Sequence, residues 1–431
     1  MSEKTVKIGL LGAGTVGLQV ARILREQNRE LSARAGAKLV LSGVAVRDTG
    51  KVRPGIDSAL LTSDIDRVID NADLVIELMG GLEPARTAML RALQHGKTVV
   101  TGNKAVLATH GPELNVAADT HDASLYFEAA VAGAVPVVYG LRESLAGDRI
   151  NQVLGIVNGT TNYILDQMST QGWSYEQALA KAQELGFAEA EPSADVEGHD
   201  AAAKCAILAS LAYHTRVSIS DVPTKGITEI TPADIAQARE AGYVVKLLAK
   251  AERVMVNGQE QIALGVEPTL VPQTHPLAGI NGPYNAIVLE TEFAGRLMFY
   301  GAGAGGAPTA SAVLSDVVAG AGHIANGGHA PRESTYAALP ISDPGLVQTR
   351  LQLRLEVSQQ IGSLSQVLQA CLDQGVSVAS VRQPLVESGA DQATLFISTH
   401  SASRQQLDAI LAVLAKSPLV HRIASVLSVE Q

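Results

Sequence analysis

The chain has 431 residues, of which 46% are hydrophobic, 18% charged and 3% aromatic, and its formal net charge is -10. This length allows two or three domains with cores of their own, and the composition is that of a globular rather than a disordered protein. A negatively charged chain with few aromatic residues lacks the basic patches and stacking surfaces that nucleic acids require, so we expect no nucleic-acid partner.

The two cysteines, Cys205 and Cys371, lie far apart and form no CxxC motif. This predicts neither a disulfide framework nor a cysteine metal site, and it favours a reducing cytoplasm. The first apolar run is broken by glycines and then by Gln19 and Arg22. We therefore expect neither a signal peptide nor a membrane span.

Short apolar strands alternate with helices in the first third of the chain. We expect a helix at 18–27 and strands at 5–11, 38–46, 73–80, 97–105 and 124–131. This alternation predicts an α/β fold with a parallel sheet covered on both faces, a doubly wound Rossmann domain over residues 1–135.

The rest of the chain predicts two further domains. Residues 136–338 are expected to form a central α+β domain for substrate binding, catalysis and oligomerisation, with a return segment near 301–325 that closes on the cofactor. Its expected elements are a strand, turn and helix over 152–165, two Ala-rich helices, and strands at 262–271, 285–293 and 295–301. After a turn-rich linker at 339–348, residues 350–431 predict a βαββαβ domain, with elements at 351–357, 363–373, 376–382, 393–399, 403–416 and 420–429.

The sequence KIGLLGAGTVG places Gly12, Gly14 and Gly17 between an expected strand and an expected helix. Glycines at this spacing provide a tight turn, close approach of the backbone to a pyrophosphate and close helix–strand packing. With a second strand about 20 residues further on, the pattern indicates a dinucleotide site rather than an ordinary glycine turn.

The second strand ends in VAVRD, so Arg47 precedes Asp48. An acidic residue here accepts hydrogen bonds from the ribose of NAD, whereas an arginine accommodates the 2′-phosphate of NADP. Arg47 favours NADP and Asp48 leaves NAD open, while a solvated surface arginine is an equal alternative.

The stretch GAGAGG at 301–306 repeats the GxGxxG spacing without the Rossmann pattern behind it. We interpret it either as a plain turn or as a loop whose amides close over the same cofactor.

Two polar motifs follow expected strands. Lys104 lies just past a strand of the nucleotide domain, where doubly wound sheets bind ligands; a surface lysine is the alternative. NGTTNYIL (158–165) is a turn of the kind that often serves only as a helix cap. Its small donors nevertheless make it a candidate substrate contact, with Thr161 among them.

Asp200 and Lys204 stand four residues apart at the head of an apolar helix. Such residues share one helix face, and an ordinary ion pair is the plain alternative. Because the helix continues as CAILASLA, we interpret the pair as catalytic. Burial would make the lysine a base by lowering its pKa, whereas the carboxylate favours the charged form, so the two effects oppose each other.

Three histidines are weaker candidates. His199 adjoins the pair but points elsewhere on the helix, and His323 and His329 lack metal-ligand spacing. We therefore expect no transition-metal site.

Five motifs, in order and spacing, resemble homoserine dehydrogenase over residues 5–335: KIGLLGAGTVG, TGNKA, GIVNGTTNYIL, GFAEAEPSADVEGHDAAAK and YGAGAGGAPTASAV. The tail resembles the regulatory ACT domain of many members, and with no aspartate-kinase module ahead of the motifs we expect the monofunctional form. The resemblance implies reversible, NAD(P)-dependent oxidation of L-homoserine to L-aspartate 4-semialdehyde, in threonine and methionine biosynthesis. We expect a cytoplasmic homodimer or homotetramer without membrane contact.

The resemblance also assigns roles to residues. Lys204 matches the catalytic lysine, Asp200 a substrate-contacting aspartate, and Lys104 a lysine near nicotinamide and substrate. Homoserine binding falls to Glu189 and Asp195. Together with Arg47, the cofactor positions are Gly12, Gly14, Thr15, Val16, Gly17, Lys104, Gly186 and Gly301. A sodium site made mostly of main-chain oxygens maps to Glu128, Val131, Gly133 and Val135.

The tail departs from the ACT pattern at one turn. Ile361-Gly362 stands where such domains usually have Pro-Gly. The glycine that admits a ligand to the backbone is kept, but the lost proline leaves the effector open, so threonine feedback is a hypothesis.

Two other functions are compatible with the sequence: a dehydrogenase for a different small amino or hydroxy acid, and a nucleotide-binding sensor with the tail as its output. Intact Lys104, Glu189, Asp200 and Lys204 speak against the sensor. Whether Lys204 alone or together with Lys104 carries the proton stays open.

Overall fold

The computed structural model describes residues 4–384 and 391–430, and in it the chain forms two units. The first unit comprises Met1–Gly159, Asp200–Val222 and Pro283–Ala338. The second unit comprises Thr160–His199, Pro223–Gly282 and Leu339–Gln431.

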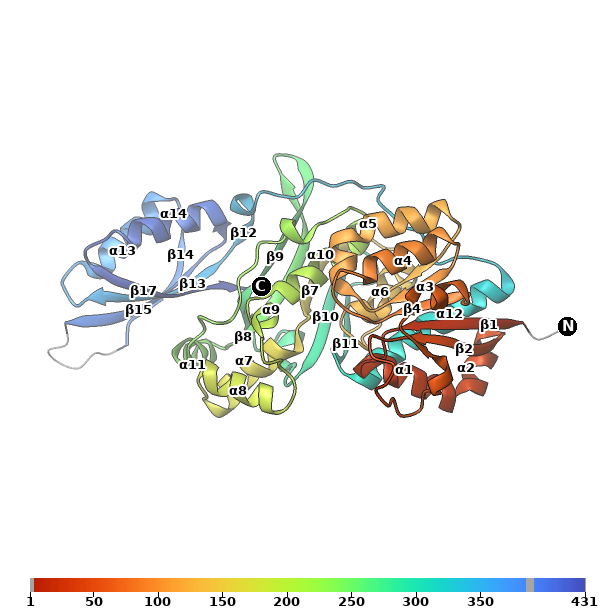
Figure 1. The fold of residues 1–431 in the computed structure, drawn as a ribbon. Coiled ribbons are helices and arrows are strands. Elements are labelled where there is room, and N and C mark those ends of the chain that lie inside the picture. Colours follow the sequence, from red (N-terminus) through yellow and green to blue (C-terminus); the bar gives the residue numbers. More distant parts are fainter. Residues whose placement is uncertain (1–3, 385–390, 431) are drawn as a thin grey trace. The chain divides into compact units, whose positions relative to one another are not determined.

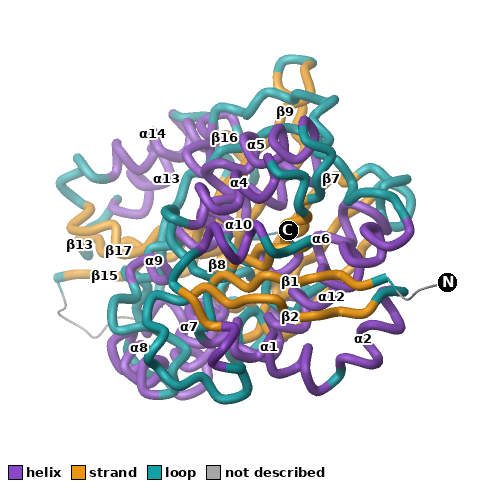
Figure 2. The backbone as a smooth tube through the Cα atoms, turned by 45° about the vertical axis from the view of Figure 1, so that its right-hand side comes forward, coloured by secondary structure: helices purple, strands orange, loops and turns teal. Residues whose placement is uncertain are grey.

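A six-stranded parallel sheet forms the centre of the first unit, in the order β3-β2-β1-β4-β5-β6 (Figures 1 and 2). Its strands are β1 (Thr5–Leu11), β2 (Lys38–Ala45), β3 (Leu61–Thr62), β4 (Leu74–Glu77), β5 (Thr98–Thr101) and β6 (Leu125–Tyr126). In β1, Ile8 lies opposite Leu41 of β2 and Leu74 of β4. The strand order reverses between β1 and β4, where doubly wound sheets bind dinucleotides. The predicted α/β Rossmann fold is thus confirmed.

The last three predicted strands of this sheet are shorter than expected. For each of these strands, the predicted range also included residues that instead form the turn or the helix end after the strand. Asn103, for example, caps the helix after β5, and Glu128–Ala130 form a 3₁₀ turn after β6.

The helices of the first unit are α1 (Thr15–Glu26), α2 (Asn28–Ala35), α3 (Ile65–Asp70), α4 (Ala85–Gln94), α5 (Lys104–Thr120), α6 (Val137–Tyr139), α10 (His199–Tyr213) and α12 (Gly306–Asn326). Helix α12, drawn in cyan among the red and orange N-terminal elements of Figure 1, packs against α1, α2 and the sheet. Its Val313 and Val317 are fully buried in the same core as Leu10 and Val20. A segment near residue 310 therefore completes a domain that begins at residue 5.

Three antiparallel strands also belong to this unit, in the order β11-β10-β7. They are β7 (Ile150–Ile156), β10 (Tyr284–Thr291) and β11 (Arg296–Ala302). Strand β7 leads directly into Val157 and Asn158, and β11 leads into the second glycine loop, so both deliver site residues.

The second unit begins with the helices α7 (Gly159–Gln171), α8 (Tyr175–Glu184), α9 (Ser193–Val196) and α11 (Pro232–Glu240), followed by the strands β8 (Tyr243–Val256) and β9 (Gln259–Pro272). The two strands form a long hairpin around Asn257 and Gly258, both with positive φ. Asn-Gly is the preferred dipeptide for such a turn. Strand β8 was not predicted, because its buried residues form a continuous run, 245–249, and its sequence lacks a period-two pattern.

The C-terminal part follows the predicted βαββαβ order. Its elements are β13 (Leu351–Ser358), α13 (Ser363–Asp373), β14 (Val378–Arg382), β15 (Gln392–Thr399), α14 (Arg404–Leu414) and β17 (Val420–Val429), with the two-residue strands β12 (Gln348–Thr349) and β16 (Ala402–Ser403) added. The main strands form an antiparallel sheet in the order β17-β13-β15-β14. Strand β13 alternates as predicted, with Leu351, Leu353 and Leu355 buried against both helices.

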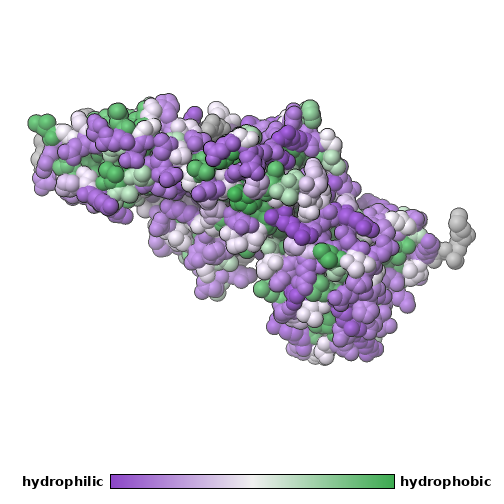
Figure 3. Space-filling model, turned by 90° about the horizontal axis from the view of Figure 1, so that it is seen from above, coloured by the Kyte–Doolittle hydropathy of each residue, from purple (hydrophilic) through white to green (hydrophobic). Residues whose placement is uncertain are grey.

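Within the described ranges, no helix is long and apolar enough to cross a membrane. On the face shown in Figure 3, hydrophobic residues lie in small groups among hydrophilic ones.

Candidate active site

The loop between β1 and α1 forms a cradle in which two of the three glycines, Gly12 and Gly17, leave no room for a side chain. Gly12 has a φ of +95°, and a Cβ there would lie 2.6 Å from the carbonyl oxygen of Leu78. A Cβ on Gly17 would lie 2.2 Å from the carbonyl oxygen of Gly12. A Cβ on Gly14 would meet no atom within 4 Å, and no side chain caps the first turn of α1. The open N-terminus of α1 is therefore suited to an anion such as a pyrophosphate.

The second glycine loop lies beside this cradle. A Cβ on Gly306, the first residue of α12, would lie 3.1 Å from the carbonyl oxygen of Thr15 and from Cγ of Gln19. Val16 packs against the core of the Rossmann sheet, and Gly301 lies on β11. GAGAGG is thus a loop next to the dinucleotide cradle.

Arg47 and Asp48 follow β2, and both are exposed. Oδ1 of Asp48 accepts a hydrogen bond from the backbone N–H of Gly50 at 2.9 Å, and Arg53 donates to the Asp48 carbonyl oxygen at 2.7 Å. Arg47 forms no salt bridge within the described part of the chain. The arginine is thus accessible, while the aspartate is engaged in its own turn.

Lys104, Asp200 and Lys204 come together in the first unit. Nζ of Lys204 donates to Oδ2 of Asp200 and to the carbonyl oxygen of Val157, each at 2.7 Å. Lys104, at the start of α5, forms an ion pair with Oδ1 of Asp200. The side chains of Asp200 and Lys204 are 4% and 9% exposed, whereas that of Lys104 is 44% exposed.

Asn158 completes this cluster, since its Nδ2 donates to Oδ2 of Asp200 at 2.9 Å. Burial alone would raise the pKa of Asp200, but Lys204 and Lys104 outweigh it and hold that pKa well below its usual range. The cluster therefore combines one ionised carboxylate with two lysines. Sequence reasoning missed Asn158, although the motif that contains it was singled out.

Local structure fixes Lys104 in its place. Oδ1 of Asn103 caps the first turn of α5 by accepting from the N–H of Val106 at 3.2 Å, and its Nδ2 donates to the carbonyl oxygen of Gly81 at 2.8 Å. His199, by contrast, has a side chain that is 61% exposed and contacts Glu197, so it lies outside the cluster.

Four predicted site residues belong to the second unit: Thr161, Gly186, Glu189 and Asp195. Oδ2 of Asp195 accepts from the hydroxyl of Thr160 at 3.1 Å. Thr161 is 1% exposed, while Glu189 is exposed. Thr160, which was not predicted, thus contacts an acidic site candidate.

Glu128 lies in a buried turn of the first unit. Its carboxylate accepts from the backbone N–H groups of Val138 at 3.0 Å and Tyr139 at 2.7 Å, and its own N–H donates to Asp316. Burial raises the pKa of Glu128 to about 7 and that of Asp316 to about 8. The charge of Glu128 also raises the pKa of Asp316, so a cation near these buried carboxyls would stabilise their ionised forms.

The backbone after Glu128 offers oxygens for such a cation. Val131, Gly133 and Val135 are buried, and the carbonyl oxygens of the first two accept no hydrogen bond from any described residue. Gly133 has a φ of +61°, and a Cβ there would lie 2.5 Å from the carbonyl oxygen of Gly303. These groups fit a hard cation that prefers oxygen ligands. Within the described residues, no three His, Cys, Asp or Glu side chains cluster as metal ligands.

A dinucleotide cradle at the switch point of a parallel sheet, with a buried lysine–aspartate cluster in the same unit, defines an NAD(P)-dependent oxidoreductase that acts on a CH–OH group. The family model for the NAD binding domain of homoserine dehydrogenase matches residues 12–128, and the model for homoserine dehydrogenase matches residues 136–318. The chain belongs to the homoserine dehydrogenase family.

Individual relatives match either the whole chain or a large part of it. The homoserine dehydrogenase of Corynebacterium glutamicum is 50% identical over 99% of this chain and 96% of its own. The crystal structure of a homoserine dehydrogenase from Thiobacillus denitrificans, 35% identical, has a TM-score of 0.94 over 100% of this chain and 99% of its own. A hyperthermophilic archaeal homoserine dehydrogenase in complex with NADPH, 27% identical, has a TM-score of 0.61 over 73% of this chain and 97% of its own.

Proposed function

We propose that this protein catalyses the reversible oxidation of L-homoserine to L-aspartate 4-semialdehyde, with NADP preferred and NAD also accepted. We place this reaction in threonine and methionine biosynthesis, in a cytoplasmic homodimer or homotetramer. The observation that carries the proposal is the buried pair Asp200 and Lys204, joined by the half-exposed Lys104, in the unit that holds the dinucleotide cradle.

The chemistry needs a hydride acceptor and a base. When bound, the nicotinamide cofactor supplies the hydride acceptor. As the C4–H bond of homoserine breaks, its hydroxyl proton passes to a lysine amine, and the C–O single bond becomes the aldehyde C=O. In the reverse direction the lysine ammonium donates that proton to the aldehyde oxygen.

We assign the acceptance of the hydroxyl proton to Lys204, with Lys104 as its partner. Lys204 is the more buried of the two, and two acceptors fix its amine. Asp200 stabilises the ammonium form, so a substrate that draws Asp200 toward itself would release the amine to act as a base. Lys104, which is more exposed, would adjust between Asp200, nicotinamide and substrate.

The substrate ammonium would be held by Glu189 and Asp195, with Thr161 contributing from the same motif. The contact of Asp195 with neighbouring Thr160 supports a substrate role for this polar region. Gly186 and Gly301 would line the cofactor. In this scheme residues 1–135 bind the cofactor, residues 136–338 bind substrate and assemble the oligomer, and residues 350–431 regulate.

The preference for NADP rests on the exposed Arg47 beside an engaged Asp48. The relative bound to NADPH supports the same choice. We expect Arg47→Ala to raise the KM for NADP roughly tenfold while the KM for NAD changes less than threefold. Equal changes for both cofactors would contradict the assignment.

Sodium would be held by Glu128 and the carbonyl oxygens of Val131, Gly133 and Val135. The C-terminal βαββαβ domain would act as an ACT-like regulatory module that binds an amino acid such as threonine, with Gly362 (φ of +98°) at its first strand-to-helix turn. Unchanged turnover at saturating threonine would remove threonine as the effector.

The primary test is reduction of NADP and, separately, NAD by the purified protein with L-homoserine. Rapid reduction that depends on homoserine supports the proposal. Cofactor binding without reduction by homoserine would point to another small amino or hydroxy acid, to be sought with a substrate panel. Binding without reduction by any panel member would favour the sensor.

A further inference from the structure

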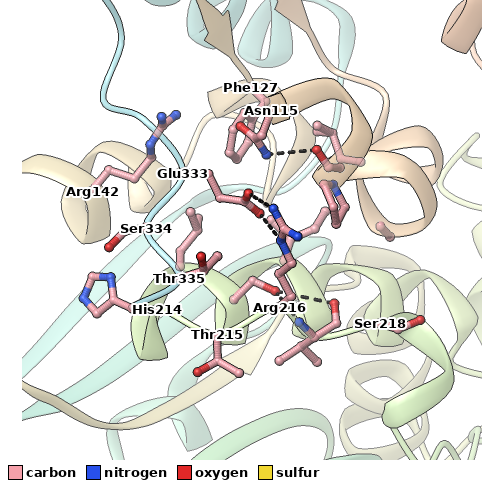
Figure 4. A pocket seen from close by; sticks show the side chains of 18 of the residues that line it. Asn115, Phe127, Arg142, His214, Thr215, Arg216, Ser218, Glu333, Ser334 and Thr335 are labelled. Carbon is pink, nitrogen blue, oxygen red and sulfur yellow. Dashed lines mark hydrogen bonds and ion pairs between the residues drawn. The ribbon is translucent and has the colours of Figure 1, made fainter. Parts of the chain in front are cut away.

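A cavity of about 260 Å³ lies inside the first unit, between α5 and α10 (Figure 4). A water occupies about 30 Å³ of liquid, so this volume suits a small organic molecule. Most of its wall is apolar, with side chains from both helices and from the segments near Phe127 and Leu141. The main apolar residues are Leu107, Pro112, Phe127, Leu141, Ile207 and Leu211.

This cavity is separate from the lysine–aspartate cluster. Its wall includes none of Lys104, Asp200 and Lys204. It begins at Leu107 on α5 and at Ile207 on α10, about one helical turn beyond the lysines. The cluster and the cavity therefore occupy successive positions along the same two helices.

One wall of the cavity carries a positive charge without an ion-pair partner. The guanidinium of Arg142 lies over the ring of Phe127, 5.0 Å from its centroid, and donates to the carbonyl oxygen of Pro331. No carboxylate of the described residues forms a salt bridge with it. Arg216, which also lines the cavity, is instead neutralised by Glu333, with contacts of 3.2 and 2.6 Å (Figure 4).

Three carboxyl groups, those of Glu128, Glu143 and Asp316, lie near Arg142 on the side of a second, smaller cavity. Burial lowers the pKa of Arg142, and the charges of Asp316 and Glu143 oppose this from a distance. None of the three described carboxyls forms a salt bridge with the guanidinium. An arginine stays protonated even when burial lowers its pKa.

We propose that this cavity is an effector site for a small organic carboxylate with an apolar body, whose carboxylate pairs with Arg142. An arginine without a carboxylate partner is the group that would recognise such an anion, and the apolar wall would hold the body. Ser334 and Thr335 lie at the edge of the cavity, and the hydroxyl of Thr335 supplies a further donor (Figure 4).

Occupancy of this site would affect the cluster through the two helices. Lys104 heads α5 and Asp200 lies in the first turn of α10, and their ion pair joins the two ends. A ligand that touches both helices binds one separation of α5 and α10 more tightly than another. The cluster shifts between these two arrangements only as far as the ligand's difference in affinity for them allows. This coupling rests on the proposed function, whereas the binding itself does not.

The test uses the full chain with hexanoate and benzoate as probes and with hexanamide and benzamide as neutral controls. We expect calorimetry to show one carboxylate site with a dissociation constant in the millimolar range and at least tenfold weaker binding of the amides. Ser334→Trp should abolish binding by filling the cavity entrance, while Ser334→Ala, the matched control, should bind normally. Arg142→Met should weaken binding at least tenfold, and Ser334→Trp keeps the test valid if the Arg142 variant does not fold.

Three binding results would overturn the site: no binding at about 50 mM probe, equal binding of acid and amide, or unchanged binding by Ser334→Trp. Displacement of the probe by homoserine would also overturn it, by placing the probe in the substrate site. For the coupling, we expect the probe to change kcat without competing with homoserine; an unchanged kcat at saturating probe would overturn the coupling. If homoserine oxidation itself were absent, the calorimetric result would still stand, so the two failures are distinguishable.

Discussion

Lys204 in the first unit and Lys246 in the second are both buried, at 7% and 3% exposed. Each donates a hydrogen bond to a backbone carbonyl, Lys204 to Val157 and Lys246 to Ile280. The difference between them lies in the second acceptor. For Lys204 it is the carboxylate of Asp200 at 2.7 Å, whereas for Lys246 it is an amide oxygen at 3.0 Å.

The partner of a buried lysine affects how strongly its amine holds a proton. Burial lowers the pKa of Lys246 to about 8, and the more distant Asp166 only partly opposes this. The amide that accepts from Lys246 belongs to Asn162, which also donates to the carbonyl oxygens of Ile280 and Gly282. Lys246 thus joins β8 to α7 and to a loop as a structural amine, while Lys204 shares its carboxylate with a second lysine.

The largest effect should come from removing the amine of the cluster. We expect Lys204→Met to reduce kcat for homoserine oxidation by roughly 10² to 10⁴-fold, the usual contribution of a general base, with cofactor binding retained. Steady-state kinetics and cofactor titration would measure both. Lys246→Met is the matched control and should keep turnover within about threefold; an equal loss in both variants would mean that burial, not the cluster, matters.

Asp200→Asn would give Lys204 the kind of partner that Lys246 has. We expect kcat to fall on the order of 10²-fold, because two lysines then face each other without a carboxylate. We also expect the acidic limb of the pH–rate profile to move to lower pH, since the ammonium form loses its stabilising charge. A lowered rate with an unmoved limb would show that Asp200 acts on the substrate alone.

The charge of Lys246 should appear in stability rather than in rate. Because its folded pKa lies below the unfolded value, the unfolded chain binds more protons between about pH 8 and pH 10.5, so wild-type stability rises with pH in that window. We expect the difference in unfolding free energy between wild type and Lys246→Met to grow by roughly 3 kcal/mol across it. Urea unfolding at several pH values would measure this, and a pH-independent difference would contradict the shift.

Burial raises the pKa of a carboxyl group, whereas it lowers the pKa of a lysine. The smallest expected effect follows from this for Glu128. The raised pKa of Glu128 means that its stabilising contribution is present below about pH 4.5 and is lost as the pH rises through about 7, unless a cation compensates. We expect sodium, compared with tetramethylammonium, to raise Tm by about 2 °C or more at pH 8.5 but not at pH 5.5. Glu128→Gln should remove the sodium effect; an effect that survives in this variant would place the ion elsewhere.

Much of the fold could be predicted because it follows from local patterns. The glycine loop has a recognisable glycine spacing. The parallel strands are short continuous apolar runs, and the first strand of the βαββαβ tail alternates between apolar and polar residues. Strand β8 was missed because its sequence does not alternate between apolar and polar residues. Lys246 was missed with it, since a lysine in an unrecognised strand gives no signal of burial.

The candidate site was predicted in composition but not in its contacts. Asp200 and Lys204 share one helix face, so their pairing follows from spacing. The ion pair of Lys104 with Asp200 and the hydrogen bond from Asn158 join segments 96 and 42 residues away from Asp200. Only tertiary packing brings such segments together, and no local pattern encodes it.

The position of α12 has a consequence for synthesis of the chain. The Rossmann sheet is encoded before residue 127, yet part of its apolar surface is covered by Val313 and Val317. During synthesis on the ribosome, part of the apolar surface of the first domain therefore stays exposed until almost 200 further residues have been made. A nascent chain halted before α12 would be a natural substrate for chaperones and a poor candidate for a stand-alone nucleotide-binding fragment.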